Sequence, residues 1–364
     1  MQVTQGALRR GVAVTQRITD THVCRADVLH ISEAYGGGVQ SAISRYIENS
    51  PSLVHQVLVR TRSEHDIAEP CGAETISYNG SLTGFIRAAR AHILRTKPNA
   101  IHLHSSFAGL LRLFDFGPDI KIVYTPHAYA FLRRDSSGAA RSAYRAIETV
   151  LSKRAQTIAA ISPFEAASAA RMAGPSTEVT YLPNVVPDAA LVPPSDHGPD
   201  GRPEVVMAGR ISAQKDPLFF AEVARASHSN VRWTWVGDGD VDMREVLEQA
   251  GVVITGWVPS DLVKKHIAAA DLYLHSAEWE GAPITLLEAA AVGTPILARG
   301  IDALEGLGFP LTRNCPRAAA DAVDRFFSDR AYRHRAQRET RESVAVHSPA
   351  VQSLALDALY RRAG

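Results

Sequence analysis

Short apolar runs alternate with longer stretches of helical periodicity along most of the chain. In the first half, the pattern predicts strands at residues 28–31, 54–59, 100–104, 120–124, 157–161 and 179–182. It predicts amphipathic helices between them, notably at residues 40–49, 82–97 and 139–154. This alternation is typical of parallel sheets whose strands are joined by crossover helices.

The second half repeats the pattern. Strands are predicted at residues 205–208, 233–236, 252–255, 272–275 and 295–298. Helices are predicted at residues 217–227, 241–249, 260–269, 284–292 and 317–327. Each half is therefore expected to be a doubly wound α/β domain.

A proline-rich segment separates the halves, with six prolines between Pro183 and Pro203 that cannot lie inside helices or central strands. We expect a flexible extension over residues 1–25, a first domain over 26–190 and a linker over 191–203. A second domain is expected over 204–345, followed by a helix over 346–364 that could cross back to the first domain.

The composition of the 364 residues indicates an ordinary globular protein, with 46% hydrophobic and 21% charged residues. The net charge of +1 argues against a protein that wraps nucleic acid, so we expect no nucleic-acid partner. The three cysteines have no paired or metal-type spacing. Together with the absence of an apolar leader in the first 22 residues, this favours a cytoplasmic location.

Basic residues concentrate between residues 80 and 160, where 12 Lys and Arg stand against 4 Asp and Glu. The predicted helix 82–97 combines apolar residues on one side with several arginines. We expect this helix to rest on an anionic membrane surface at the inner face of the cell membrane. The alternative is a crossover helix that packs its apolar side on the sheet.

Three loops at predicted strand ends carry candidate chemistry. Gly36-Gly-Gly38 opens a helix after the first strand, and Gly209-Arg-Ile-Ser-Ala-Gln-Lys215 follows the first strand of the second half. Such loops bring backbone amides and two cations to a phosphate, although a tight turn and two solvated charges are the alternatives. The third loop carries Glu280, eight residues before Glu288. These carboxylates could accept hydrogen bonds from hydroxyl groups of a sugar. The alternatives are a negative charge at a helix N-terminus for Glu280 and an ordinary polar residue for Glu288.

Histidines provide a further candidate. His102 and His104 lie two apart on one face of a predicted strand, as a metal-binding pair could. No third ligand is spaced with them in sequence, so packed or hydrogen-bonded histidines are the favoured interpretation.

These motifs as a set resemble the retaining family-four glycosyltransferases, which have the GT-B fold of two Rossmann-like domains facing a central cleft. The resemblance runs from about residue 27 to the C-terminus. In the second half it rests on Gly209-Arg-Ile-x-x-x-Lys215, Val236-Gly-Asp-Gly239, Glu280-x7-Glu288 and Gly293-Thr-Pro. In the first half it rests on Gly36-Gly-Gly38, His104, Thr125-Pro-His127, Ser162 and Leu182-Pro-Asn184.

The resemblance implies a nucleotide diphosphate sugar as donor and a carbohydrate or lipid-linked acceptor, with no cofactor and no metal. The implied catalytic residues are His127, Arg210, Lys215 and Glu280. The implied donor-binding residues are Gly37, Gly38, Gly209, Gly281, Ala282, Pro283, Ile284, Thr285 and Glu288.

Two positions depart from the family pattern, namely Ala282 and the turn Ala298-Arg-Gly-Ile301, and both border the donor site in that family. The expected activity is a hexosyl transfer in envelope or extracellular polysaccharide or glycolipid synthesis, with retention at the anomeric carbon. The alternatives are a nucleotide-sugar epimerase, a sugar phosphorylase and, in a different class, a non-catalytic sugar-binding protein.

Overall fold

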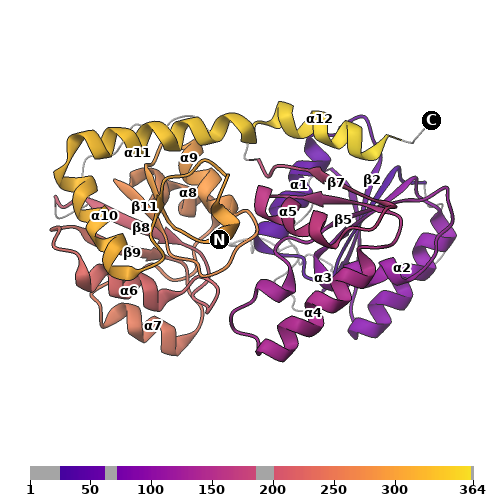
Figure 1. The fold of residues 1–364 in the computed structure, drawn as a ribbon, viewed down its shortest axis with the longest axis horizontal. Helices are drawn as coiled ribbons and strands as arrows, with labels where there is room; N and C mark the ends of the chain where they lie inside the picture. The colour runs from indigo at the N-terminus through magenta and orange to yellow at the C-terminus, as the bar shows by residue number, and fades with distance from the viewer. Residues whose placement is uncertain (1–24, 62–71, 186–200, 362–364) are drawn as a thin grey trace, which may run out of the picture.

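The computed structural model describes residues 25–61, 72–185 and 201–361, which form two α/β domains (Figure 1). The first domain holds a seven-stranded parallel sheet in the order β3-β2-β1-β4-β5-β6-β7. Its elements are β1 (Val28–Ser32), α1 (Gly37–Glu48), β2 (His55–Arg60), β3 (Glu74–Tyr78), α2 (Leu82–Thr96), β4 (Ala100–His104), α3 (Ser105–Ala108), β5 (Lys121–Thr125), α4 (Gly138–Leu151), β6 (Gln156–Ala160), α5 (Pro163–Met172) and β7 (Thr177–Tyr181).

The second domain holds a six-stranded parallel sheet in the order β10-β9-β8-β11-β12-β13. Its elements are β8 (Glu204–Ala208), α6 (Pro217–Ala226), β9 (Arg232–Val236), α7 (Val241–Glu248), β10 (Val253–Ile254), α8 (Ser260–Ala269), β11 (Leu272–His275), α9 (Ile284–Ala291), β12 (Ile296–Arg299), β13 (Leu311–Thr312), α10 (Pro316–Ser328), α11 (Arg330–Ser343) and α12 (Pro349–Tyr360). The predicted α/β class with two doubly wound domains is confirmed.

Every predicted strand is present, with bounds that differ by no more than three residues. The prediction missed the edge strands β3 and β13, which have few buried apolar residues. In β3, Ile76 is the one aliphatic side chain and no residue is fully buried. The pattern of buried positions therefore gives no strand signal there.

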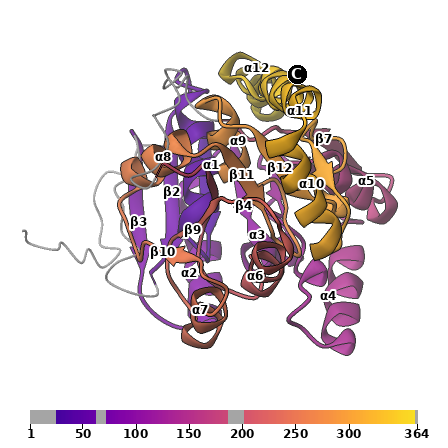
Figure 2. The same cartoon turned by 90° about the vertical axis from the view of Figure 1, so that its left-hand side faces the viewer.

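The last helix joins the two domains. As Figure 1 shows, α11 and α12 run along one side of the molecule from the second domain to the first, and Figure 2 views them end-on. Leu356, Leu359 and Tyr360 of α12 enter an apolar cluster with Val28 and Tyr46 of the first domain. Gln352 adds a hydrogen bond from its side-chain amide to the carbonyl of Pro183 at 2.7 Å. The helix thus ties the end of the chain to the first sheet.

The prediction that helix 82–97 rests on a membrane surface was wrong, because its apolar side is not exposed. Phe85, Ala89 and Ile93 of α2 are fully buried in the core of the first domain, so the apolar side of this helix packs on the sheet. Within the described residues, no helix is both long and apolar enough to cross a membrane.

Several expectations concern residues outside the described ranges. The expected N-terminal extension lies there, except for residue 25, and so do most of the linker, Cys24 and Cys71. Cys315 is described, and it is a free, exposed cysteine.

Candidate functional site

The clearest charged pair of the second domain joins Lys215, in the loop after β8, to Glu280, in the loop after β11. Both loops leave the carboxyl ends of adjacent parallel strands, which brings them together. The Lys215 ammonium is hydrogen-bonded to Oε1 of Glu280, and Nε2 of Gln214 donates to Oε2 at 3.3 Å. The side chains are only 16% and 7% exposed, so water screens this pair weakly.

Glu280 is ionised in this setting. Burial alone would raise its pKa, but the charge of Lys215 and the His275 ring, whose Nε2 lies 3.5 Å from Oε1, outweigh burial and lower the pKa to about 2. An ionised carboxylate accepts hydrogen bonds and donates none. Glu280 can therefore accept hydrogen bonds from hydroxyl groups but cannot act as a general acid near neutral pH.

The Lys215 loop is held by residues for which the sequence predicted no supporting role. Arg299, at the end of β12, is buried, and its Nη1 contacts Oδ2 of Asp216 at 2.6 Å and the carbonyl of Ser276 at 3.0 Å. Oγ of Ser276 donates to the carbonyl of Lys215 at 2.6 Å. Asp216 has a left-handed backbone, with φ of 48°, and caps α6 by accepting from the amide of Phe219. Arg299, a departure noted above, therefore supports the Lys215 loop.

Glycines allow the loop after β8 to pack closely against the loop after β9. A Cβ on Gly237 would lie 2.2 Å from the carbonyl oxygen of Gly209, so only glycine fits there. Gly209 has φ of 147°, and its carbonyl accepts from Nε1 of Trp235 at 2.9 Å. Arg210 follows it with an exposed side chain, and none of the described residues forms an ion pair with it. Its guanidinium is available to an anion.

Two helices, one in each domain, begin without a side-chain cap. The N-cap of α9 is Pro283 and that of α1 is Gly36, and neither first turn contains an acidic residue. Gly36, Gly37 and Gly38 are exposed, and a Cβ on any of them would meet no atom within 4 Å. Uncapped N-termini present unpaired amides and a partial positive charge, which suits an anionic ligand.

The remaining predicted donor-binding positions surround the start of α9. Gly281, Ala282 and Pro283 are buried, whereas Ile284 and Thr285 are half-buried. Glu288 lies in the second turn and is half-buried. Burial raises its pKa, while Lys264 and Arg45 of the first domain lower it. Glu288 is thus close to both domains.

The first domain meets α9 through His127. His127 and Ala128 follow β5 with φ of 52° and 75°, a strained conformation for residues with a side chain. Oε2 of Glu165 accepts from the amide of Ala128 at 3.0 Å, and Oε1 accepts from that of Ile161 at 3.1 Å. A Cβ on Gly281 would lie 2.8 Å from the amide nitrogen of Ala128. We call this contact between the His127 and Gly281 loops the domain junction.

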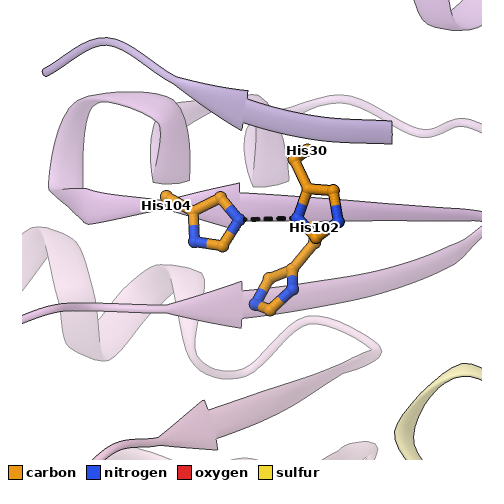
Figure 3. Close-up of side chains that lie close together, drawn as sticks. All are labelled: His30, His102 and His104. Carbon is orange, nitrogen blue, oxygen red and sulfur yellow. Dashed lines mark hydrogen bonds between the residues drawn. The ribbon is translucent and has the colours of Figure 1, made fainter. Parts of the chain in front are cut away.

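The structure corrects the statement that His102 and His104 lack a third ligand. His30 of β1 lies opposite His102 in the sheet register, and one ring nitrogen from each of the three lies within 4.8 Å of the others (Figure 3). The sequence could not show this because 72 residues separate His30 from His102. His30 is hydrogen-bonded to His104, with 3.0 Å between Nδ1 and Nε2.

A separate cavity of about 560 Å³ lies elsewhere on the second domain, lined by residues that include His228, Asp271, Asp324 and Arg333. Asp324 already accepts hydrogen bonds from the backbone amides of His228 and Ser229 and from two serine hydroxyls. None of the predicted site residues lines this cavity. We therefore place the candidate site at the domain junction and the adjoining Lys215–Glu280 pair.

The fold and the site define an α/β protein of two parallel-sheet domains that presents helix N-termini, cations and an ionised carboxylate beside their junction. Residues 202–329 match the family of glycosyl transferases group 1, and residues 37–185 match the glycosyl transferase 4-like domain. The chain belongs to this family of glycosyltransferases.

Two relatives illustrate the similarity. An uncharacterised 41.2 kDa protein in the cps region of Klebsiella pneumoniae is 26% identical over 297 residues, which cover 76% of this chain and 82% of that protein. A UDP-Gal:alpha-D-GlcNAc-diphosphoundecaprenol alpha-1,3-galactosyltransferase of Escherichia coli is 29% identical over 108 residues, which cover 26% of this chain and 27% of that enzyme.

Solved structures confirm the GT-B fold. Sucrose-phosphate synthase from Thermosynechococcus elongatus superposes with a TM-score of 0.77 at 18% identity, covering 92% of this chain and 98% of that one. Anabaena Alr3699/HepE, solved in complex with UDP-glucose, superposes with a TM-score of 0.71 at 14% identity, again covering 92% and 98%.

Proposed function

We propose that this glycosyltransferase moves a hexosyl group from a nucleotide diphosphate sugar to an acceptor hydroxyl. One observation carries the proposal, namely the buried Lys215–Glu280 pair beside the uncapped N-terminus of α9. A diphosphate is bound by cations and backbone amides, and a sugar is bound by a group that accepts hydrogen bonds from its hydroxyl groups. This arrangement offers both. HepE, which shares the fold, was solved with UDP-glucose.

The residues would divide the work as follows. Arg210 and Lys215 would neutralise the diphosphate as it leaves, together with the amides at the start of α9 and of α1. Such stabilisation of developing charge is commonly the largest protein contribution, about 3 to 4 kcal/mol for one donor group. Glu280 would accept hydrogen bonds from hydroxyl groups of the transferred sugar, and Glu288 would accept them from the nucleotide ribose.

We further propose that transfer retains the anomeric configuration and needs neither a metal nor a cofactor. Support for retention is the resemblance to the retaining family alone. Support for metal independence is chemical, because Arg210 and Lys215 supply the positive charge that a divalent cation would otherwise bring to the diphosphate.

The acceptor is proposed to be a lipid-linked carbohydrate approached from the inner face of the cell membrane, in envelope or extracellular polysaccharide synthesis. The Escherichia coli relative acts, by its name, on a diphosphoundecaprenol-linked sugar. Helix α4 supplies a better surface than α2. Ala139, Ala143, Ala146, Ile147 and Val150 are all exposed at helical spacing, with Ile147 46% and Val150 65% exposed.

Positive charge accompanies this α4 face. Arg134, Arg145, Lys153 and Arg154 are exposed on or next to the helix, whereas Glu148 is buried against Arg112 at 2.8 Å. Apolar side chains flanked by cations fit an anionic bilayer surface, where each cation contributes about 1 kcal/mol.

Sedimentation with vesicles of phosphatidylcholine and phosphatidylglycerol tests the membrane part. We expect binding that requires the anionic lipid and weakens as salt rises. The double variant Ile147→Glu and Val150→Glu should stay in the supernatant, while Val241→Glu, at a still more exposed position on α7, should bind as the wild type does. Equal sedimentation of both variants would remove the membrane from the proposal.

The activity itself is tested by screening nucleotide sugars for thermal stabilisation and then following nucleoside diphosphate release with and without acceptor sugars. We expect release that depends on an acceptor. Conversion of the nucleotide sugar to an isomer without an acceptor sugar would instead identify an epimerase, and turnover that needs inorganic phosphate in place of an acceptor sugar would identify a phosphorylase. Binding without turnover under any condition would identify a sugar-binding protein.

A further inference from the structure

A continuous row of imidazoles, buried except for the half-buried His127, crosses the first sheet and ends at the domain junction. Ring nitrogens of successive histidines lie 3.0 Å apart from His55 to His30, from His30 to His104 and from His104 to His127. Each link pairs an Nδ1 atom with an Nε2 atom. We call these four residues the histidine row.

The row exists because of strand register. Val28 of β1 lies opposite His55 of β2, and His30 lies opposite His102 of β4. Side chains two residues apart point to the same face of a sheet, so His30, His55, His102 and His104 share one face. Tyr46 of α1 and Tyr360 of α12 cover this face, with the Tyr46 ring stacked 6.1 Å from that of His104.

All four histidines of the row are neutral at pH 7. Burial lowers the pKa of His55, His30, His104 and His127, and the neighbouring rings lower those of His30 and His104 further. A neutral imidazole has one N–H donor and one acceptor nitrogen. In a row of neutral rings, the direction of one hydrogen bond therefore determines the direction of the next.

Ser50 determines the direction at the far end. Its hydroxyl donates to the carbonyl of Tyr46, so it has no hydrogen left for His55. Nε2 of His55 lies 3.0 Å from this hydroxyl oxygen and 3.2 Å from the carbonyl oxygen of Ser50. Both groups can only accept there, so Nε2 of His55 must carry the hydrogen.

This assignment then passes along the row. Because Nδ1 of His55 is an acceptor, Nε2 of His30 donates to it, and Nδ1 of His30 accepts from Nε2 of His104. Nδ1 of His104 accepts in turn from Nε2 of His127. The Nδ1 atom of His127 is left with a lone pair, and among the described residues none hydrogen-bonds to it.

We propose that the histidine row fixes His127 as the Nε2–H tautomer, so that its Nδ1 accepts a hydrogen bond from a hydroxyl group of a bound sugar and cannot bind the diphosphate. The inference rests on the proposed function for the identity of the ligand, but the tautomer itself does not. His55, His30 and His104 are positioning residues, because they act through His127.

A metal ion at His30, His102 and His104 is the competing interpretation. Every ring nitrogen of these three residues already has a partner, since His102 contacts the hydroxyl groups of Tyr360 and Thr125 at 2.7 Å each. A metal would have to break several of these bonds and would end the tautomer pattern of the row.

Nitrogen-15 spectra of the histidine rings in the ligand-free wild-type protein test the tautomer directly. We expect His55, His30, His104 and His127 all to carry the hydrogen on Nε2 at pH 7. A hydrogen on Nδ1 of His127 overturns the proposal. Stoichiometric Zn²⁺ binding that shifts the His30, His102 and His104 signals also overturns it.

Variants at His55 test the relay, since this residue is three rings away from the junction. His55→Leu removes the acceptor for His30, so we expect mixed tautomers at His127 and a three- to tenfold loss of turnover, the value of about one hydrogen bond. His55→Asn keeps an acceptor near the position of Nδ1 and should restore both. His92→Leu is the control, because His92 is a buried histidine outside the row that bonds to Gln56.

The two proposals can fail separately. A fixed Nε2–H tautomer with no acceptor-dependent transfer would overturn the proposed function and leave the tautomer assignment intact. Normal transfer with unchanged tautomers in His55→Leu would overturn the relay alone.

Discussion

The two sides of the domain junction satisfy their buried polar groups in different ways. On the second domain, Lys215 and Glu280 form an ion pair, with Arg299 and Asp216 paired behind them. On the first domain, four histidines are neutral and bonded in a row that leads to His127. The charged side suits a ligand that brings and releases charge, and the neutral side suits a ligand that brings hydroxyl groups.

Lys215→Ala should have the largest effect. It removes a cation from the proposed diphosphate site, so we expect transfer to fall by about 10²- to 10³-fold. It also leaves the buried Glu280 carboxylate without its main partner, which should lower the melting temperature. Initial rates and thermal unfolding measure both effects, with Lys265→Ala, an exposed lysine of α8, as the control. A variant with unchanged rates would remove Lys215 from the site.

Arg210→Ala separates charge from stability. The Arg210 side chain is exposed and has no described ion pair, so its loss should cost about a hundredfold in transfer and nothing in melting temperature. Donor affinity and turnover, measured beside those of Lys215→Ala, show whether the two cations act alike. Near-normal values in both variants would contradict the diphosphate role.

Gly281→Ala tests the contact between the two sides. A Cβ at this position would lie 2.8 Å from the backbone nitrogen of Ala128, and backbone cannot move aside as a side chain can. The His127 loop and α9 must then separate, so we expect a 10- to 100-fold loss of turnover, as for small displacements of reacting groups. Gly138→Ala, where a Cβ would meet no atom within 4 Å, is the matched control. Equal turnover of the two variants would contradict the importance of the junction.

The sequence anticipated the charged side better than the neutral side. Lys215 and Glu280 follow apolar strands within short motifs, so their position could be inferred from strand ends. Arg299 was noted only as a departure, because its partner Asp216 is 83 residues away. The histidine row depends on the order β2-β1-β4 and on its register, neither of which is visible in local periodicity. Edge strand β3 was missed because it buries little apolar surface.

Glu165 offers a pH test of the neutral side. Burial raises the pKa of this carboxyl to about 7, even though the amides of Ile161 and Ala128 lower it. The folded state therefore binds a proton more tightly than the unfolded state, and the contribution of Glu165 to stability should fall as pH rises from about 4.5 to about 7. At 1.36 kcal/mol for each pKa unit, the change is at most about 3 kcal/mol.

Comparison of the unfolding free energies of wild type and Glu165→Gln across this pH range isolates the effect, because the variant cannot titrate. The wild type should lose stability relative to the variant as pH rises. Glu222→Gln, at an exposed position of α6, should parallel the wild type. A constant difference between wild type and Glu165→Gln would show that Glu165 keeps an ordinary pKa.

A chelator should have the smallest effect, because neither side of the junction is expected to use a metal. Asp238-Gly-Asp240 resembles a metal-binding sequence, but Asp238 is bonded to Arg244 at 3.0 Å and Asp240 caps α7 by accepting from the amide of Met243. On the first domain, every ring nitrogen of His30, His102 and His104 is hydrogen-bonded to another histidine or to a hydroxyl group. Transfer rates should therefore stay within about twofold after EDTA treatment and exhaustive dialysis. Loss of transfer that Mg²⁺ or Mn²⁺ restores would place a metal on the charged side, whereas restoration by Zn²⁺ alone would direct attention to the histidines.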